Sequence, residues 1–328
     1  LLNGNFEYTT TGVDQAQIDD LKINSAKLSN AAGSSMNVDV TLVNSATTGS
    51  VFLLDDGAGL VDANGEGQVT FEVTGNKGTQ QFTFAEGTAI ADVANAINSF
   101  SDALGVTATS AAAGDDIQID SIGYGTDQFV RVRQLSENSG SNFVSSASNG
   151  AAVNDLKAFG ADAEVNINGI SATTNGLKAR VSSEGFDVSI MLDSAFAGAG
   201  GTGGTSSFSI TGGGADFNLG PQVNLANKVS LGIDAVTTGS LGSSASGTLD
   251  SLKAGGLSNV VNGDLSKAQG VVEDAIKQVS SMRGRLGAFQ KNTVGSTINS
   301  LSIALENTSA AESVIRDADF AAETRSEE

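Results

Sequence analysis

The C-terminal part of the chain carries apolar side chains at helical spacing, and this pattern constrains the fold more than any other feature. The apolar or small positions recur every three or four residues as Val272, Ala275, Val279, Met282, Leu286 and Phe289. The pattern then slips by one residue and continues as Val294, Ile298, Leu301 and Leu305. Such a slip changes the local winding of a helix without ending it.

No proline occurs from Ser266 to Thr308, so this stretch is predicted to form one helix about 60 Å long. Propensity alone gives a helix little stability in water, so its apolar stripe needs other helices or neighbouring subunits. The pair Ser309 and Glu312 fits a capping box and predicts that a second, short helix begins there. A core helix of an ordinary globular domain is the alternative, but such helices usually span about 8 to 20 residues.

The composition argues against catalysis and against several classes of partner. The 328 residues include no histidine and no cysteine, and the net charge is −20. No nucleophile and base pair can be nominated, and nucleic acid and anionic membranes are disfavoured by the acidic balance. Asp62 to Gly67 imitates a calcium loop, but Val73 stands where the closing carboxylate belongs. We therefore predict no enzyme activity, no catalytic residue, no cofactor and no metal.

Alternating runs and turn signals predict β-rich modules before the helix. Met36, Val38, Val40 and Leu42 alternate as in a half-buried strand. The next module is predicted to have one amphipathic helix, with Thr88 as its N-cap and Gly105 as its stop. Its strands are predicted at 69–73, 81–84, 106–109, 117–120 and 129–132, followed by a linker at 137–150. A second module has turns at Asn168-Gly169 and Asn175-Gly176.

Three ordered runs resemble a known family. They are Met282 to Asn292 (MRGRLGAFQKN), Ser296 to Leu301 (STINSL) and Ser309 to Ala321 (SAAESVIRDADFA). Together they are similar to the C-terminal rod helix of bacterial flagellin and the turn after it. The stretch from Phe217 to Leu241 resembles the β-hairpin of the flagellin rod, and the stretch around Ile97-Asn98 resembles a repeat of flagellin and hook proteins.

The resemblance implies a structural subunit of the bacterial flagellar filament that is extracellular and self-assembles through helix packing. It implies an α+β, elongated, multi-domain chain with surface-exposed variable modules. The expected divisions are strands leading out of the rod (1–48), an outer α+β module (49–137), an outer β module (138–210) and the rod portion (211–328). The expected partners are other flagellin subunits, an export chaperone and a Toll-like innate immune receptor, with no nucleic acid and no membrane.

Two sets of site residues follow from the stripe and the resemblance. The expected helix-packing seam is Val279, Met282, Leu286, Phe289, Ile298, Leu301 and Leu305. The expected contacts with subunits or the receptor are Arg283, Gln290, Arg316, Asp317, Asp319 and Phe320.

The chain also departs from the family pattern. No helices precede Leu1 and no apolar helix follows Glu328, so we expect no filaments from this chain alone, and weak or no receptor signalling. The seam is expected to be covered by the chain's own modules or by a second copy. The alternatives are a secreted adhesin or glycan-binding β protein with a helical stalk, the hook-to-filament junction protein and an enzyme inserted in the outer modules. With two tyrosines and scattered phenylalanines, the chain offers few rings for stacking on sugars.

Overall fold

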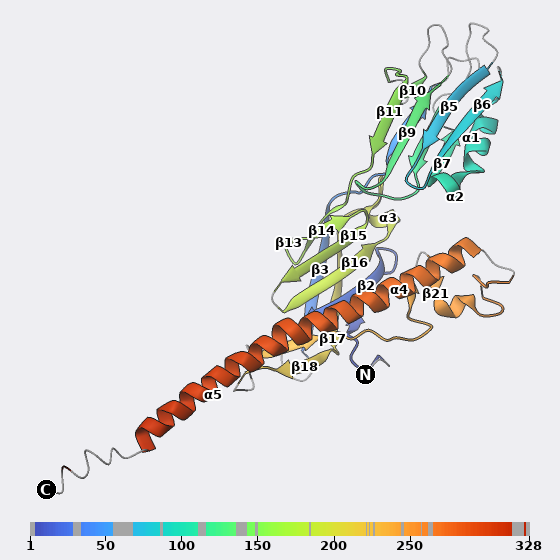
Figure 1. Ribbon diagram of the computed structural model, residues 1–328. Coiled ribbons are helices and arrows are strands. Elements are labelled where there is room, and N and C mark those ends of the chain that lie inside the picture. Colours follow the sequence, from blue (N-terminus) through green and yellow to red (C-terminus); the bar gives the residue numbers. More distant parts are fainter. Residues whose placement is uncertain are drawn as a thin grey trace. The chain divides into compact units, whose positions relative to one another are not determined.

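The chain has a mixed α+β fold with β-rich sheets and a single long C-terminal helix (Figure 1). The computed structural model describes residues 4–28, 34–54, 68–85, 88–110, 116–135, 143–147, 150–183, 185–220, 222, 224–225, 227–243, 246–256, 258–261, 265–316 and 325. Two compact units divide the chain. The central unit is Thr10–Ile23 with Ser35–Thr211, and the C-terminal unit is Leu1–Thr9, Asn24–Ser34 and Gly212–Glu328.

The central unit contains a module of two four-stranded antiparallel sheets and two short helices. One sheet has the order β10-β4-β8-β7 and the other has the order β11-β9-β5-β6. The bounds are β4 (Ser50–Leu53), β5 (Gln68–Thr74), β6 (Thr79–Ala85), α1 (Ile90–Asn98), α2 (Ser101–Leu104), β7 (Val106–Ser110), β8 (Ile117–Ser121), β9 (Phe129–Gln134), β10 (Val144–Ser145) and β11 (Asp155–Phe159). The five strands predicted for this module are confirmed.

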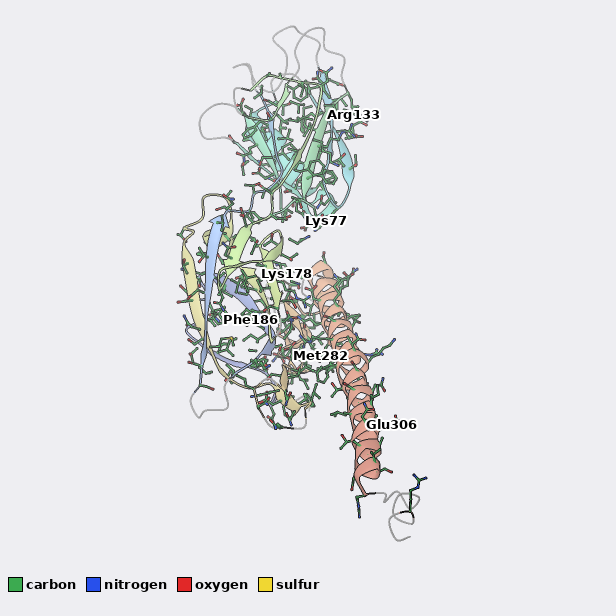
Figure 2. The ribbon with its side chains drawn as sticks, turned by 90° about the vertical axis from the view of Figure 1, so that its left-hand side faces the viewer. Lys77, Arg133, Lys178, Phe186, Met282 and Glu306 are labelled. Atoms are coloured by element: carbon green, nitrogen blue, oxygen red, sulfur yellow. The ribbon has the colours of Figure 1, made fainter. Side chains whose placement is uncertain are left out.

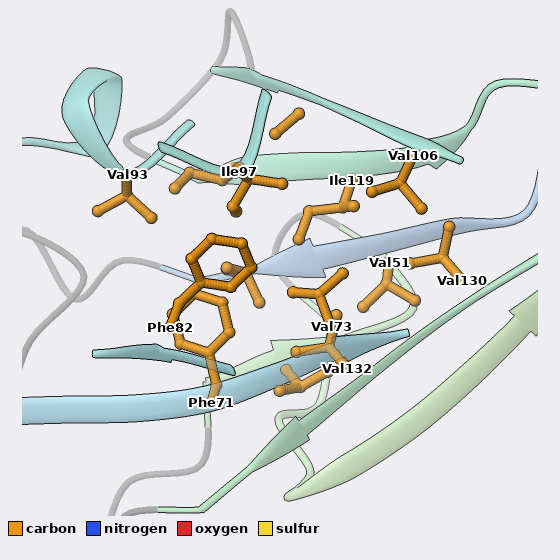
Figure 3. Close-up of a cluster of buried hydrophobic side chains, with 14 of the residues drawn as sticks. Val51, Phe71, Val73, Phe82, Val93, Ile97, Val106, Ile119, Val130 and Val132 are labelled. Carbon is orange, nitrogen blue, oxygen red and sulfur yellow. The ribbon is translucent and has the colours of Figure 1, made fainter. Parts of the chain in front are cut away.

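The core of this module lies between the two sheets and α1 (Figure 3). Phe71 of β5 is fully buried, and its ring centroid lies 5.9 Å from that of Phe82 and 5.8 Å from that of Phe143. Val93 and Ile97 of α1 are buried in the same cluster. Alternation along the strands and three- to four-residue spacing along the helix therefore converge on one apolar core.

The single helix predicted from Thr88 to Leu104 is wrong, because the structure has two helices with a break between them. The Thr88 hydroxyl donates to the Ala85 carbonyl (2.7 Å), and Ala89 is the N-cap of α1, without a side-chain cap. Phe100, at the break, is 42% exposed. The predicted stop is confirmed, because Gly105 has φ +74° in the left-handed region.

The linker predicted at 137–150 is wrong in part, since this stretch contributes to the core. Val144 pairs with Leu53 as strand β10, and Phe143 and Val144 are buried. A Ser- and Asn-rich composition hid these two apolar residues from a reading of the sequence. Residues 136–142 and 148–149, like the calcium-like segment 62–67, lie outside the described residues.

Two further sheets contain the remaining strands of the central unit. Their orders are β1-β17-β3-β12-β13 and β14-β15-β16-β2. The bounds are β1 (Thr9–Thr11), β2 (Ile18–Ala26), β3 (Met36–Asn44), β12 (Glu164–Ile167), β13 (Ile170–Ser171), β14 (Thr173–Asn175), β15 (Lys178–Ser183), β16 (Phe186–Leu192), α3 (Ser194–Ala197) and β17 (Thr205–Gly212).

Both predicted Asn-Gly turns occur in hairpins of these sheets. Asn168 and Gly169 both have positive φ and join β12 to β13. In the second hairpin Asn175 pairs with Lys178, so the two-residue loop begins one position later than predicted, at Gly176. The predicted strand from Met36 is confirmed as β3, with Val38 and Val40 buried.

The C-terminal unit consists of two small hairpins and a long helix. Its elements are β18 (Ala215–Asn218), β19 (Lys228–Leu231), β20 (Gly242–Ser243), β21 (Gly247–Thr248), the 3-10 helix η1 (Leu249–Leu252), α4 (Leu265–Ala288), the π-helical segment η2 (Phe289–Val294) and α5 (Gly295–Arg316). The hairpin predicted around Phe217 and Val229 is confirmed, because these residues pair. No helix within the described ranges is long and apolar enough to cross a membrane.

The second helix predicted to begin at Ser309 is wrong, because α5 runs through this residue to Arg316. The Thr308 hydroxyl donates to the Ala304 carbonyl (2.8 Å), so it bonds back into the preceding turn. Alanine and glutamate after Ser309 are good helix formers and continue the helix. The predicted change of winding is confirmed, because η2 occupies the position of the slip.

Asp162 connects three loops of the central unit. Its carboxylate accepts hydrogen bonds from the Thr126 amide (3.1 Å), the Thr126 hydroxyl (2.7 Å) and the Gly176 amide (2.7 Å). Gly176 has φ +60°, and a Cβ there would lie 2.6 Å from the Tyr124 carbonyl oxygen. Burial raises the pKa of Asp162, but the three hydrogen bonds favour the carboxylate and bring the pKa below its usual value.

We expect Phe71→Ala to lower the free energy of unfolding by about 3 to 5 kcal/mol, because it removes a buried ring and leaves a cavity. Calorimetric unfolding of the purified chain measures this change. Phe100→Ala is the control, since that ring is half-exposed, and it should cost less than about 1 kcal/mol. Equal costs for the two variants would contradict the assignment of the core.

We expect Asp162→Asn to destabilise the central unit by about 1 to 2 kcal/mol at pH 7, a value kept low because the carboxylate retains contact with water. A lowered folded-state pKa adds stability above the unfolded-state pKa, and that stability is lost as the pH falls through the folded-state value. The difference between the two proteins should therefore shrink toward pH 3. Urea unfolding at both pH values tests this, and a difference independent of pH would refute it.

Candidate functional site

The long helix has one face that is covered by the rest of the C-terminal unit. Ala268, Val271, Ala275 and Met282 of α4 are buried. Met282 forms a small core with Ala215 and Ile233, against which Phe6, Val236 and Leu286 pack. Figure 2 labels Met282 on the helix. The covered face therefore follows the predicted spacing, but it begins at Ala268 and includes Val271, while Val272 lies on the exposed side.

An aromatic contact lies at the C-terminal end of the covered face. The ring of Phe289, at the start of η2, lies 5.1 Å from the ring of Phe217 on the β18–β19 hairpin, at an interplanar angle of 47°. Offset and tilted ring pairs of this kind add to the stability that burial alone provides.

Three polar side chains of α4 fix the helix to neighbouring backbone and hydroxyl groups. The side-chain oxygen of Gln278 accepts a hydrogen bond from the backbone N–H of Gly242 (3.1 Å), and its side-chain nitrogen donates to the Gly242 carbonyl. Asp274 accepts hydrogen bonds from the hydroxyls of Ser243 (2.8 Å) and Ser246. Arg285 donates to the Gly232 carbonyl (3.0 Å) and lies 3.5 Å from Asp234. These contacts set the rotation of the helix about its axis, because each requires one orientation of α4.

The apolar pattern continues on the C-terminal side of η2, but no described part of the chain covers it there. Ile298, Leu301 and Leu305 are exposed, Leu301 to 43% and Leu305 to 72%. From Ile298 to Arg316 every side chain that the structure describes is exposed. Figure 2 labels Glu306 on this stretch. We call Ile298, Leu301 and Leu305 the exposed strip.

The π-helical segment keeps the exposed strip in line with the covered face. Phe289 and Val294 are five residues apart, one more than an α-helical stripe allows. A π-helix bonds residue i to residue i+5 and so takes up the extra residue within one turn. Val294 and Thr297 are still partly buried, which is consistent with a stripe that passes through η2 into α5.

The structure divides the expected seam into a covered part and an uncovered part. Met282 is buried and Val279, Leu286 and Phe289 are half-buried, whereas Ile298, Leu301 and Leu305 are exposed. Among the expected contact residues, Arg283 and Gln290 are exposed, and Arg316 is exposed and pairs with Glu312 at 3.0 Å. Asp317, Asp319 and Phe320 lie outside the described residues.

The reading of the sequence missed the polar part of the covered face. Asp274, Gln278 and Arg285 stand one turn apart from, or next to, the apolar residues of the stripe, and this placement was the available signal. Their partners are small residues and backbone groups 28 to 53 positions away, which no local pattern identifies.

Shortening a side chain should have different effects on stability in the covered and uncovered parts of the helix. We expect Met282→Ala to lower the free energy of unfolding by about 2 to 4 kcal/mol, and Leu305→Ala to change it by less than about 0.5 kcal/mol. Urea unfolding followed by helical circular dichroism measures both, because most described helical residues belong to α4, η2 and α5. A large loss from Leu305→Ala would show that the isolated chain covers the exposed strip.

Two segments of the chain match known protein families. Residues 269–326 match the bacterial flagellin C-terminal helical region, which includes the covered face, η2 and the exposed strip. Residues 68–121 match the flagellin hook IN motif, from β5 through α1 and α2 to β8.

Named relatives agree with these matches. The chain is 58% identical over 53 residues to flagellin of Bacillus subtilis (strain 168), which is 16% of this chain and 17% of that protein. It is 43% identical over 58 residues to the flagellar filament 31.3 kDa core protein of Treponema maltophilum, which is 18% of this chain and 20% of that protein. The chain thus spans about a fifth of the length of these curated relatives.

Solved structures of the flagellar cap protein FliD are also similar, but distantly. The D2-D3 domains from Escherichia coli align with 63% of this chain and 99% of theirs, at 11% identity and a TM-score of 0.36. Those from Serratia marcescens align with 53% and 93%, at 19% identity and a TM-score of 0.32. TM-scores of this size are too low to establish a common fold. The two family matches and the named relatives show that residues 68–121 and 269–326 are similar to flagellin-family sequences, through the hook IN motif and the C-terminal helical region.

Proposed function

We propose that this chain is a structural subunit of a bacterial flagellar filament, and that the exposed strip is the surface through which it joins other subunits. The observation that carries the proposal is the continuation of the apolar pattern past η2, onto the part of α5 from Ile298 onward, whose described side chains are all exposed. Most helical stability in proteins comes from packing of an apolar face, so α5 gains stability when a partner covers its strip.

The strip is large enough to support assembly. Covering a half-exposed Leu or Ile side chain contributes about 1 to 2 kcal/mol, so three such residues supply several kcal/mol for each copy. Repeated along a filament, contacts of this strength accumulate. The net charge of −20 opposes non-specific association of the outer surfaces, which favours contact through the apolar strip.

The remaining elements of the proposal follow from the family. Other flagellin subunits are the proposed partners, and an extracellular filament is the proposed location. Residues 49–137 and 138–210 are proposed as surface-exposed outer modules, 1–48 as strands leading out of the rod and 211–328 as the rod portion. Arg283 and Gln290 are exposed on α4 and η2, so they are accessible to an export chaperone, another subunit or an innate immune receptor.

A chimera with the Bacillus subtilis flagellin tests the proposal. Residues 269–326 of this chain replace the corresponding helical region of that flagellin, and electron microscopy shows whether filaments form. We expect the chimera to form filaments, and we expect Leu301→Glu to abolish them because a carboxylate would be placed in the packed strip. Asn299→Glu is the matched control, since Asn299 lies about 160° from Leu301 around the helix. A chimera that stays monomeric, or one that tolerates Leu301→Glu, would contradict the proposal.

The π-helical segment provides a second prediction. Insertion of one alanine after Asn292 in the same chimera adds a residue that η2 does not take up, so the exposed strip turns by about 100° relative to the covered face. We expect this insertion to prevent assembly while leaving the unfolding free energy of the isolated chain within about 1 kcal/mol, because the Met282 core is unchanged. Deletion of Asn292 removes the extra residue, so the helix passes through this turn with α-helical spacing, the strip keeps its direction and the variant should assemble. Filaments from the insertion variant would show that the phase of the strip is irrelevant.

A further inference from the structure

The solvent-facing side of the sheet β11-β9-β5-β6 differs in character from the rest of the chain. In the antiparallel pair β11 and β9, Phe159 lies opposite Phe129, Lys157 opposite Arg131, and Asp155 opposite Arg133. Because side chains alternate along a strand, these six residues point to one face, while Val130 and Val132 point into the core. We call these six residues and their neighbours on β5 and β6 the basic sheet face.

Positive charge gathers on this face of an acidic protein. The chain has 17 basic and 37 acidic residues, and the central unit has seven of the basic ones. Three of these seven, Arg131, Arg133 and Lys157, share the basic sheet face with only two carboxylates, Asp155 and Glu72. The face is therefore locally positive against a net charge of −20, which favours an anionic partner.

Two aromatic rings lie beside the positive charges. The centroids of Phe129 and Phe159 are 6.0 Å apart, and Phe159 is 58% exposed. The Lys157 ammonium lies 3.8 Å from the Phe129 centroid and 4.6 Å from the Phe159 centroid. An exposed ring pair beside an ammonium offers an apolar surface and a charge within one binding site.

The arginines already show the geometry that binds a carboxylate. Arg131 donates to Asp155 from Nε (2.8 Å) and from Nη2, and Nη1 takes no part in that pair. Arg133 holds Glu72 at 3.1 Å. Each guanidinium has five N–H donors, so a second acceptor can bind without breaking these ion pairs.

Hydroxyl and amide groups extend the face across the sheet. Thr70 and Thr83 contact each other across β5 and β6 (3.1 Å), as do Thr74 and Thr79 (3.1 Å), and Gln81 lies between these pairs opposite Glu72. The result is a polar sheet surface with rings along one side. Stable protein interfaces usually have an apolar centre and bury about 800 Å² on each partner, and two rings at one margin do not supply such a centre.

We propose that the basic sheet face binds an acidic polysaccharide, with sugar rings against Phe129 and Phe159 and sugar carboxylates near Lys157 and Arg131. Charge complementarity and the mixture of rings, guanidinium groups and hydroxyls favour this class of ligand over an acidic protein surface. The inference does not depend on assembly through the exposed strip, because the two surfaces use different residues.

Binding of the purified full chain to polygalacturonate is the test, with neutral dextran as the comparison polymer. Affinity electrophoresis is run at about 20 and about 200 mM salt. Polygalacturonate should retard the chain, and less so at the higher salt concentration, whereas dextran should not retard it. We expect Lys157→Gln and Phe159→Ala each to weaken binding about tenfold.

Two matched variants separate this site from general effects of charge and ring loss. Lys178→Gln makes the same charge change on β15, and Phe100→Ala removes another exposed ring of the same module. Both should bind like the unmodified chain. No retardation, equal retardation by dextran, or equal loss in Lys157→Gln and Lys178→Gln would overturn the proposal. Self-association that Lys157→Gln abolishes would instead assign the face to a second copy, and would also overturn it.

Discussion

The burial of one face of the C-terminal helix is the interaction on which the rest of this structure depends. Met282 and the residues around it hold α4 against the β18–β19 hairpin, and Asp274, Gln278 and Arg285 fix the rotation of the helix. The rotation matters because it determines where every later apolar residue points. On the C-terminal side of η2 the same stripe continues, but the chain does not cover it. The direction in which this exposed stripe points is set by the contacts of α4, some four turns away.

The π-helical segment reconciles two sequence periods within one helix. A stripe spaced at three and four residues meets an extra residue between Phe289 and Val294, and η2 takes it up. In a regular α-helix with the same sequence, the apolar stripe after η2 would face a different direction from the stripe before it. One partner could then not contact both parts of the stripe. The segment thus aligns the covered face of the helix with the proposed assembly surface.

The sequence predicts the elements whose signal is local. Alternation identified the five strands of the module with the hook IN motif, and helical spacing identified the long helix and its change of winding. Local signals failed where two neighbours competed. Ser309 and Glu312 resemble a cap, yet the helix-forming residues after them continue α5, and Phe100 interrupts a helix that spacing alone made continuous. Strand β10 was missed because only Phe143 and Val144 are apolar in a polar segment.

The candidate surfaces were only partly predictable for a related reason. The stripe contains the exposed strip, but its division into covered and uncovered parts depends on Phe217 and Ile233, which are distant in the chain. The basic sheet face could not be predicted, because Phe129 and Phe159 meet only through the register of β9 and β11. Scattered phenylalanines in the sequence become a ring pair when the strands align.

Hydrogen–deuterium exchange along the helix tests the central claim most directly. In the isolated chain, amides from Val271 to Phe289 should exchange slowly and those from Ile298 to Arg316 quickly, with the change at η2. In assembled filaments containing this helix, the second group should become as protected as the first. Slow exchange of the Ile298–Arg316 amides in the isolated chain, or fast exchange of them in the filament, would contradict the account.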